Sequence, residues 1–319
     1  MRLSLWAAAL LWAGAAAAEP LHVTVIPVEV TMPAEARLEL LSAVELRARH
    51  PDFGGYSAIE LARDGARFVA LSDQADWFEG RLRREGDRIV AVEDARTRPL
   101  LRPEGRGAIV WRDAEALEIP DPDLDGPRWV AFERRHRIGF FAGPDAPERT
   151  VALAVDTSDW PPNDGLEGLA LAPDGRLLAL LEVKDLEARG LAAVPAWWLT
   201  PDDPADPTRL DGVATALPPP GRFAVTGADF GPDGRLYVLG RTFGVLGGFS
   251  FGVFRYEVAG DALTGPELLL ELAGSAGADN AEGISVRRDA QGRLRVTVIT
   301  DDNFNLLQRT IIYDFAAPD

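Results

Sequence analysis

The chain has 319 residues and a formal net charge of −17, from 33 basic and 50 acidic residues. An acidic balance of this size excludes the class of proteins that bind the phosphate backbone of DNA or RNA. It contains no cysteine, which rules out disulfides, thiolate metal sites and cysteine nucleophiles. A chain of this length buries a sizeable core without such crosslinks, as one large all-β domain or as two smaller domains.

The N-terminus has the pattern of an export signal. Met1-Arg2 precedes the apolar stretch Leu3–Gly14 and an alanine run that ends at Ala18, before Glu19-Pro20. This predicts a signal peptide over residues 1–18, because the apolar stretch is shorter than the roughly 20 residues that cross a bilayer. We therefore expect a periplasmic or secreted protein without membrane insertion, in which residues 19–319 form one domain. The sequence leaves its oligomeric state open.

A repeated unit follows along the chain. Each copy has a short apolar strand, a turn and a second apolar strand that ends in a polar or charged residue. The copies begin at Ser57, Glu115, Glu167, Thr226 and Glu282, at intervals of 58, 52, 59 and 56 residues. The turns contain Asp64-Gly65, Asp125-Gly126, Asp174-Gly175, Asp233-Gly234 and Gln291-Gly292. Such dipeptides tolerate positive φ, so each unit is predicted to be a tight β-hairpin.

Further strand-like segments after each hairpin give about four strands per unit. This is typical of a β-propeller, in which the first strand of each blade lines a central channel. The last unit lacks a fourth strand, and Leu38–Arg47 is predicted to supply it and close the ring. We expect five blades of four-stranded antiparallel sheets. Six blades are the alternative if His22–Val28 belongs to an extra blade, and a pair of β-sandwiches is the second alternative.

The repeated positions bring acidic residues to one mouth of the channel. The opening residues include Glu115, Glu167 and Glu282. Because antiparallel pairing places the end of the second strand beside the start of the first, a second set is expected at the same mouth. This second set comprises Asp73, Glu133, Glu182, Arg241 and Asp301, followed by Asp302 and Asn303.

Clustered carboxylate oxygens are the ligands that hard cations such as calcium prefer. We therefore predict a metal site, with calcium as the expected ion. Its predicted ligands are Glu115, Glu167, Glu282, Asp301 and Asp302. The alternative is that these groups cap strand ends and pair with arginines.

Four further residues are assigned catalytic roles around this site. Arg241 is the candidate clamp for an anionic substrate. Asp73 or Glu182 is the candidate general base, and Asn303 the hydrogen-bonding orienter. The glycine-rich stretch Gly244–Gly252, with Phe243, Phe249 and Phe251 and little polar content, is a candidate mobile lid over the channel mouth.

Five segments of the chain resemble a known bacterial family. They are Gly54–Leu82, Asp113–Glu118, Trp129–Ile138, Gly165–Glu182 and Asn280–Phe315. Together they resemble the phytase-like family described as having "esterase-like activity of phytase". The resemblance implies an exported β-propeller that hydrolyses ester or phosphate-ester bonds, and propeller phytases use calcium to bind substrate phosphates and activate water. The sequence departs from a uniform acidic ring at Ser57 and Thr226, which replace the opening glutamate, and at Ala116, which replaces glycine.

Our leading hypothesis is a metal-assisted hydrolase of a small anionic ester. A non-catalytic propeller that binds a ligand or a protein is the alternative from another class, since channel acids also fasten strands. A lactonase-like enzyme on the same ring differs only in its substrate and stays open.

Overall fold

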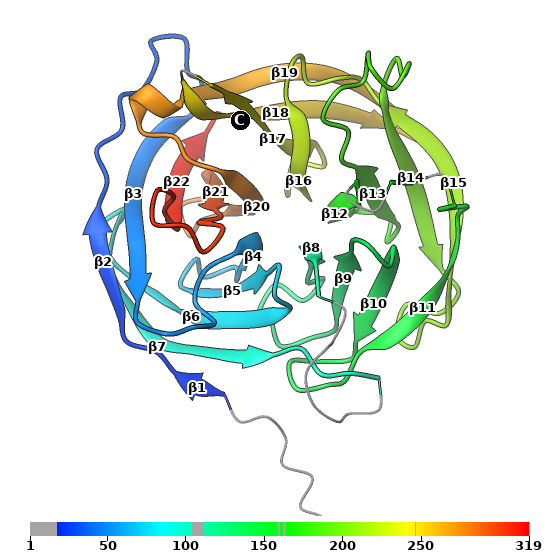
Figure 1. Cartoon of the computed structure of the whole chain (residues 1–319), viewed down its shortest axis with the longest axis horizontal. Helices are drawn as coiled ribbons and strands as arrows, with labels where there is room; N and C mark the ends of the chain where they lie inside the picture. The colour runs from blue at the N-terminus through cyan, green and yellow to red at the C-terminus, as the bar shows by residue number, and fades with distance from the viewer. Residues whose placement is uncertain (1–17, 104–111, 159, 162–163, 246, 319) are drawn as a thin grey trace, which may run out of the picture.

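The sheets are arranged radially around a common centre, as Figure 1 shows. The computed structural model describes residues 18–103, 112–158, 160–161, 164–245 and 247–318. Residues 1–17 of the predicted signal peptide therefore lie outside the described residues. The described part of the chain is all-β apart from the 3-10 turn η1 (Gly274–Ala276), and it has no helix long and apolar enough to span a membrane. The prediction of an all-β fold is confirmed.

The strands form four hydrogen-bonded sheets. The first has the order β1-β7-β6-β5-β4. Its bounds are β1 (Glu19–Pro20), β4 (Tyr56–Leu61), β5 (Arg67–Ser72), β6 (Asp76–Glu85) and β7 (Arg88–Pro99). The third has the order β16-β17-β18-β19. Its bounds are β16 (Ala224–Phe230), β17 (Leu236–Gly244), β18 (Gly248–Ala259) and β19 (Ala262–Ala273).

The second sheet consists of two consecutive four-stranded groups. The first group is β8 (Ala114–Glu118), β9 (Arg128–Phe132), β10 (Arg137–Phe141) and β11 (Arg149–Ala154). The second group is β12 (Leu166–Leu171), β13 (Leu177–Leu181), β14 (Val194–Pro201) and β15 (Arg209–Leu217). Both groups are antiparallel, and they join at their outer edges through the parallel pair β11 and β15.

The fourth sheet unites the two ends of the chain. It contains β20 (Ala281–Arg288), β21 (Leu294–Thr300), β22 (Ile311–Ala317), β3 (Glu39–Ala48) and β2 (Val23–Pro27). β3 pairs antiparallel with β22, from Glu45 opposite Ile311 to Glu39 opposite Ala316. β2 is the outermost strand of this same sheet, so the segment His22–Val28 does not start a separate one.

Four of the five predicted hairpin turns have the expected backbone. Gly65, Gly175, Gly234 and Gly292 have φ of 68°, 89°, 81° and 80°. The prediction for Asp125-Gly126 is wrong, since β8 and β9 are joined by a longer loop in which Leu124, with φ of 62°, takes the left-handed conformation. Pro127 follows Gly126, and a proline favours extended backbone in the residue before it.

A β-bulge interrupts each of the five inner strands, β4, β8, β12, β16 and β20, at the same place. The pairing register skips Ser57, Glu115, Glu167, Thr226 and Glu282, the five residues that open the sequence repeats. A bulge residue leaves the ladder, and its side chain is re-aimed. These five side chains are thereby freed from the alternation of the strand.

Small residues after the bulges let neighbouring inner strands approach closely. A Cβ at Gly283 would lie 2.7 Å from Ala58 Cα, and one at Gly227 would lie 2.7 Å from the carbonyl oxygen of Glu282. The glycines in the second position of the last two repeats are therefore explained by the close approach of neighbouring backbone. The apolar core lies farther out, between the faces of adjacent sheets, where Phe68 and Phe78 pack with Ile299 and Ile312.

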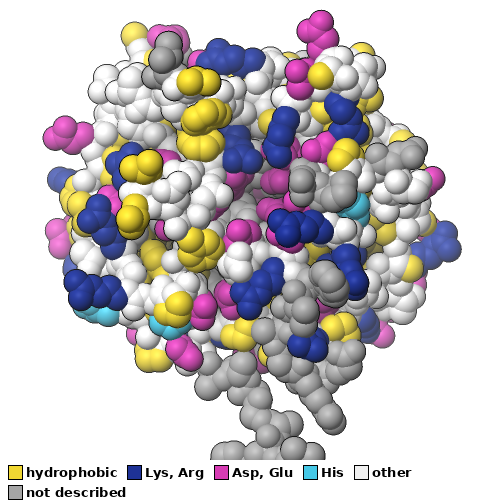
Figure 2. Space-filling model, viewed as in Figure 1, with side chains coloured by type: hydrophobic (Ala, Val, Ile, Leu, Met, Phe, Trp, Pro, Cys, Tyr) yellow, Lys and Arg dark blue, Asp and Glu magenta, His cyan; other side chains and the backbone are white. Residues whose placement is uncertain are grey.

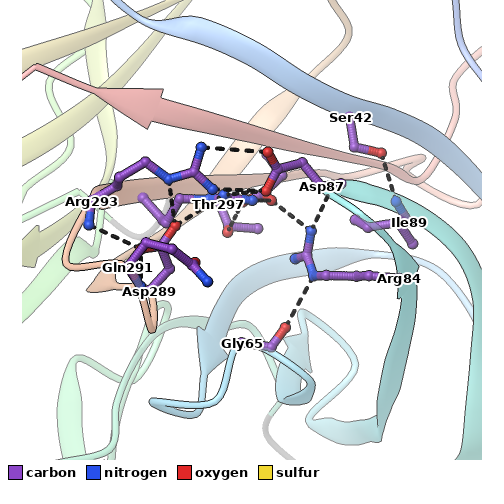
Figure 3. Close-up of polar contacts among 11 residues, drawn as sticks. Ser42, Gly65, Arg84, Asp87, Ile89, Asp289, Gln291, Arg293 and Thr297 are labelled. Carbon is purple, nitrogen blue, oxygen red and sulfur yellow. Dashed lines mark hydrogen bonds and ion pairs between the residues drawn. The ribbon is translucent and has the colours of Figure 1, made fainter.

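A buried ionic network joins the first and fourth sheets (Figure 3). Asp314, which is fully buried, accepts hydrogen bonds from Arg84 Nη1 at 2.7 Å, Arg295 Nη2 at 2.6 Å and Thr297 Oγ1 at 3.0 Å. Asp87 extends the network to Arg293 and Arg295, at 2.9 and 2.8 Å. The sheet formed by both chain ends is thus held to its neighbour by charge as well as by apolar contact.

Candidate active site at the channel mouth

The ends of the second strands lie beside the starts of the first strands, as predicted. The backbone N–H groups of Asp73, Glu133, Glu182 and Asp301 donate to the carbonyls two residues before the respective bulges, at 2.7 to 2.9 Å. Arg241 lies opposite Ala224 in the same position of the third sheet. Both predicted sets of residues therefore lie at one mouth of the channel.

This mouth is a hollow with acidic side chains in its depth. Figure 2 shows Asp and Glu side chains at the centre of the viewed face, with Lys and Arg side chains around them. The innermost part of the channel is narrow and is lined by Ser57, Glu167 and Glu282 together with small and apolar residues.

Three bulge glutamates repel one another across the channel. Burial raises the pKa of Glu115 well above its usual range, and repulsion from Glu133 and Glu282 adds to the shift. Burial likewise raises the pKa of Glu167, with further repulsion from Glu115 and Glu182. Burial raises the pKa of Glu282 to about 7, although the Arg241 guanidinium opposes the shift. Ionising all three carboxyl groups together requires added positive charge.

Arg241 is the central cation of this acidic mouth. Its Nη1 lies 2.7 Å from Glu282 Oε1, and its Nη2 lies 3.5 Å from Glu182 Oε1. Lys184 Nζ lies 3.1 Å from the other oxygen of Glu182. Both carboxylate oxygens of Glu182 are therefore engaged in ion pairs, which favours a role as counter-ion over the predicted alternative of general base.

Asp73 is the better-placed base of the two predicted. Its Oδ1 is buried and has no hydrogen-bond partner among the described residues. Burial raises the pKa of Asp73 to about 6, although hydrogen bonds from Gln74 oppose the shift, and repulsion from Asp113 and Asp302 contributes. Gly55 makes room for this carboxylate, because a Cβ there would lie 2.5 Å from Asp73 Oδ1. A carboxylate with one unpaired oxygen and a pKa near neutrality suits proton transfer.

The residues Asp301, Asp302 and Asn303 have different positions: Asp301 lies at the mouth, and the other two belong to the loop that follows it. Asp301 is buried near Glu282, and its Oδ1 accepts a hydrogen bond from the Asn303 N–H at 2.7 Å. Asp302 accepts hydrogen bonds from the N–H groups of Gly55 and Phe304 at 3.0 Å and from Thr310 Oγ1 at 3.2 Å. Asn303 itself is exposed, with φ of 47°. Asp302 thus braces the loop with both oxygens.

A deeper acidic group, here called the deep triad, was not predicted from the sequence. Glu60, Glu118 and Asp229 have ligand oxygens within 4.8 Å of one another, and theirs is the one such group found among the described residues. One oxygen of each is fixed by a neighbouring strand, through Ser285 Oγ, the Leu171 N–H and the Val286 N–H respectively. These acids stand three residues after the openings of their repeats, which is the signal that would have revealed them.

The acidic residues of the mouth offer the ligand atoms that a cation needs, but their oxygens lie farther apart than those of a formed site. Glu282 is only 7% exposed, and its Oε2 has no partner in the described part of the chain. An orphaned buried carboxylate oxygen among repelling carboxylates suits a hard cation. Among the five predicted ligands, however, no three have oxygens within 4.8 Å of one another. In this they differ from the deep triad.

A pocket of about 360 Å³ opens beside Arg241. It is lined by Glu182, Lys184, Arg222, Arg241, Phe243 and Phe249, among others. The predicted lid corresponds to the end of a long hairpin rather than to a loose loop, because β17 and β18 pair up to Gly244 and Gly248. Phe251 is fully buried in the core, so only Phe243 and Phe249 remain available to this pocket.

Comparison with known proteins gives the family. A family model described as "Phytase-like: Esterase-like activity of phytase" matches residues 51–304. The chain belongs to this phytase-like family. No curated protein matches it.

Solved structures with similar architecture share little sequence with this phytase-like chain. The PQQ-bound aldose sugar dehydrogenase of Streptomyces coelicolor is 13% identical with a TM-score of 0.44, over 89% of this chain and 100% of that one. The endo-arabinase of Bacteroides thetaiotaomicron is 13% identical with a TM-score of 0.48, over 82% of this chain and 92% of that one. At these values the likenesses say nothing about the reaction of this chain.

The deep triad predicts a pH-dependent stability. Burial raises the pKa of Glu118 to about 7 from an ordinary value of 4.5, so the folded state holds this proton more tightly than the unfolded state. The free energy of unfolding therefore decreases as the pH rises from about 4.5 to above 7. In the presence of a chelator, we expect Glu118→Gln to increase the free energy of unfolding at pH 8 by on the order of 1–3 kcal/mol and to have little effect at pH 5.

Urea unfolding at the two pH values measures this difference. Glu85→Gln, at an exposed position, is the control and should give equal changes at both. A Glu118→Gln protein that is less stable than the wild type at pH 8 in chelator would show that the triad carries no net repulsion.

Proposed function

We propose that this chain is an exported, five-bladed propeller hydrolase that cleaves a small anionic ester, with a phosphate ester as the preferred class. In this proposal the groups β4–β7, β8–β11, β12–β15 and β16–β19 are four blades, and β20–β22 with β3 form the fifth. The observation that carries the proposal is the orphaned, buried Oε2 of Glu282 within a ring of carboxylates whose pKa values are raised. Family membership over residues 51–304 supports it.

Glu115, Glu167, Glu282 and Asp301 would hold a divalent cation, with calcium the expected ion. When bound, such a cation polarises the ester and lowers the pKa of a nearby water. Its charge would also relieve the repulsion that raises the pKa values of these glutamates. Asp302 contributes indirectly in this scheme, because its oxygens hold the loop that carries Asp301 and Asn303.

The remaining residues bind and orient the substrate. Arg241 and Lys184 supply the positive charge that attracts the anionic group, and Glu182 holds both cations in place. Asp73 accepts a proton from the attacking water while the water oxygen bonds to the phosphorus. The bond from phosphorus to the ester oxygen breaks, and the released alkoxide takes up a proton from Asp73 or from solvent to leave as the alcohol. Asn303, exposed at the same mouth, orients the substrate through its amide.

The test combines calcium binding with turnover. We expect calcium to bind the wild-type protein and to support hydrolysis of p-nitrophenyl phosphate, with chelator abolishing both. Glu282→Gln should weaken calcium binding at least about tenfold, because it removes the charge that the site supplies. Glu118→Gln is the matched variant at the deep triad, and it separates the two acidic groups as calcium sites. Turnover that is indifferent to chelator and to Glu282→Gln would refute this mechanism.

A non-catalytic binding propeller is the second candidate. It is favoured by the extent of internal pairing, since Arg241 is engaged by Glu282 and Glu182 and Asp302 is used to brace a loop. Calcium binding without turnover of either p-nitrophenyl phosphate or p-nitrophenyl acetate would select this function.

A further inference from the structure

We propose that the pocket beside Arg241 selects substrates in which the anionic group is attached to a flat apolar group, such as an aromatic ring. The assignment of the reacting end rests on the proposed function, whereas the binding preference does not. The pocket combines a cationic side formed by Lys184, Arg222 and Arg241 with an aromatic wall formed by Phe243 and Phe249.

The cationic side is unusual in a chain with a net charge of −17. Three basic side chains and one acidic side chain, Glu182, line the pocket. Their own carboxylate partners also fix them in position, with Arg222 Nη2 2.6 Å from Glu271 Oε1 and Lys184 Nζ 3.1 Å from Glu182 Oε2. An anion entering here meets donors that are already oriented, which lowers the entropic cost of binding.

Part of the aromatic wall is open to solvent. Phe243 and Phe249 are cross-strand neighbours at the end of the β17–β18 hairpin, and their ring centroids lie 5.0 Å apart. Phe243 is nevertheless 63% exposed. A large exposed aromatic surface that borders a pocket is typical of a ligand site. A flat apolar group placed against these rings would remove this surface from water.

The two sides together favour an amphipathic anion over a uniformly charged one. A substrate with phosphates all round would place charge against Phe243 and Phe249 and lose its hydration there without a donor in return. A single anionic group next to Arg241 and Lys184, with its organic part toward the two rings, satisfies both sides. The pocket volume of about 360 Å³ suits a small molecule of this kind.

The experiment compares two non-hydrolysable probes with the same headgroup, phenylphosphonate and methylphosphonate, by titration calorimetry. We expect phenylphosphonate to bind about tenfold more tightly, because one buried ring adds apolar area. Phe243→Ala should remove most of this difference while it changes methylphosphonate binding by less than about twofold. Lys184→Met should weaken both probes to the same extent, since both carry the charge it contacts.

Val245→Ala is the matched control, because Val245 is 93% exposed on the same hairpin and does not line the pocket. It should leave both affinities unchanged, and Phe249→Leu provides a second test of the wall. Equal affinity for the two probes, failure of both to bind, or a preference unaffected by Phe243→Ala would overturn the inference. A ring-dependent preference in a protein that hydrolyses no ester would instead refute the proposed function and leave this inference standing.

Discussion

Asp73→Asn is expected to lower kcat for phosphate-ester hydrolysis by about 10²–10⁴-fold, the range typical for loss of a general base. The substitution keeps the size of the side chain, and the orphaned Oδ1 shows that it breaks no hydrogen bond to that atom in the described part of the chain. Calcium affinity should change by only a few fold, since Asp73 is not among the proposed ligands. Steady-state kinetics and calorimetry on the same preparations measure the two effects.

The pH profile adds a test that a structural role would not satisfy. A base is active when deprotonated, so kcat/KM of the wild type should rise with pH through about 6, the pKa to which burial raises Asp73. The rise should be absent in Asp73→Asn. In the control Asp113→Asn, the rise should move to lower pH, because repulsion from Asp113 helps to raise the pKa of Asp73. A profile that keeps its rise near pH 6 in Asp73→Asn would assign the base elsewhere.

Asp314→Asn is expected to give the largest loss of stability, about 3–5 kcal/mol, because removal of one partner leaves buried charge uncompensated. Asp314 is fully buried and accepts from Arg84, Arg295 and Thr297. Burial, with repulsion from Arg84 and Arg295, already lowers the pKa of the neighbouring Arg287 to about 10. Loss of the carboxylate would leave these guanidinium groups near one another without the buried negative charge that now balances them.

Urea unfolding at neutral pH measures the effect, with an ion pair whose carboxylate is exposed as the control. Asp261 lies 2.6 Å from Arg176, and more than half of its side-chain surface is exposed. Asp261→Asn should therefore cost less than about 1 kcal/mol. If the two substitutions cost the same, the network between the first and fourth sheets contributes no more than surface charge.

The sequence was sufficient to predict which residues meet at the mouth, because the repeat fixes where each inner strand begins. Antiparallel pairing then places Asp73, Glu133, Glu182 and Asp301 beside those starts, and the backbone hydrogen bonds show this arrangement. The division of labour within the set could not be predicted. Asp302 braces a loop and Glu182 is doubly paired, and both outcomes depend on which neighbours come within hydrogen-bonding distance.

The deep triad was missed for a specific physical reason. Simple alternation in a strand places residues i and i+2 on one side, so Glu60, Glu118 and Asp229 did not stand out three residues after the repeat openings. The bulge at each opening shifts the alternation by one residue, and it has no sequence signature beyond the glycine or alanine that follows. The same limit applies to Gly126, where a proline changes the turn that the Asp-Gly dipeptide predicts.

The inner-strand bulges carry a consequence for how such proteins diversify. A bulge residue does not set the register of the ladder, but Thr226 is fully buried and its hydroxyl donates a hydrogen bond to the Ala281 carbonyl at 2.9 Å. Ser57 and Thr226 occupy two of these five positions without a carboxyl group. A carboxyl group at Ser57 or Thr226 would add negative charge at the channel mouth, so relatives of this chain can differ in the charge of the mouth through these positions.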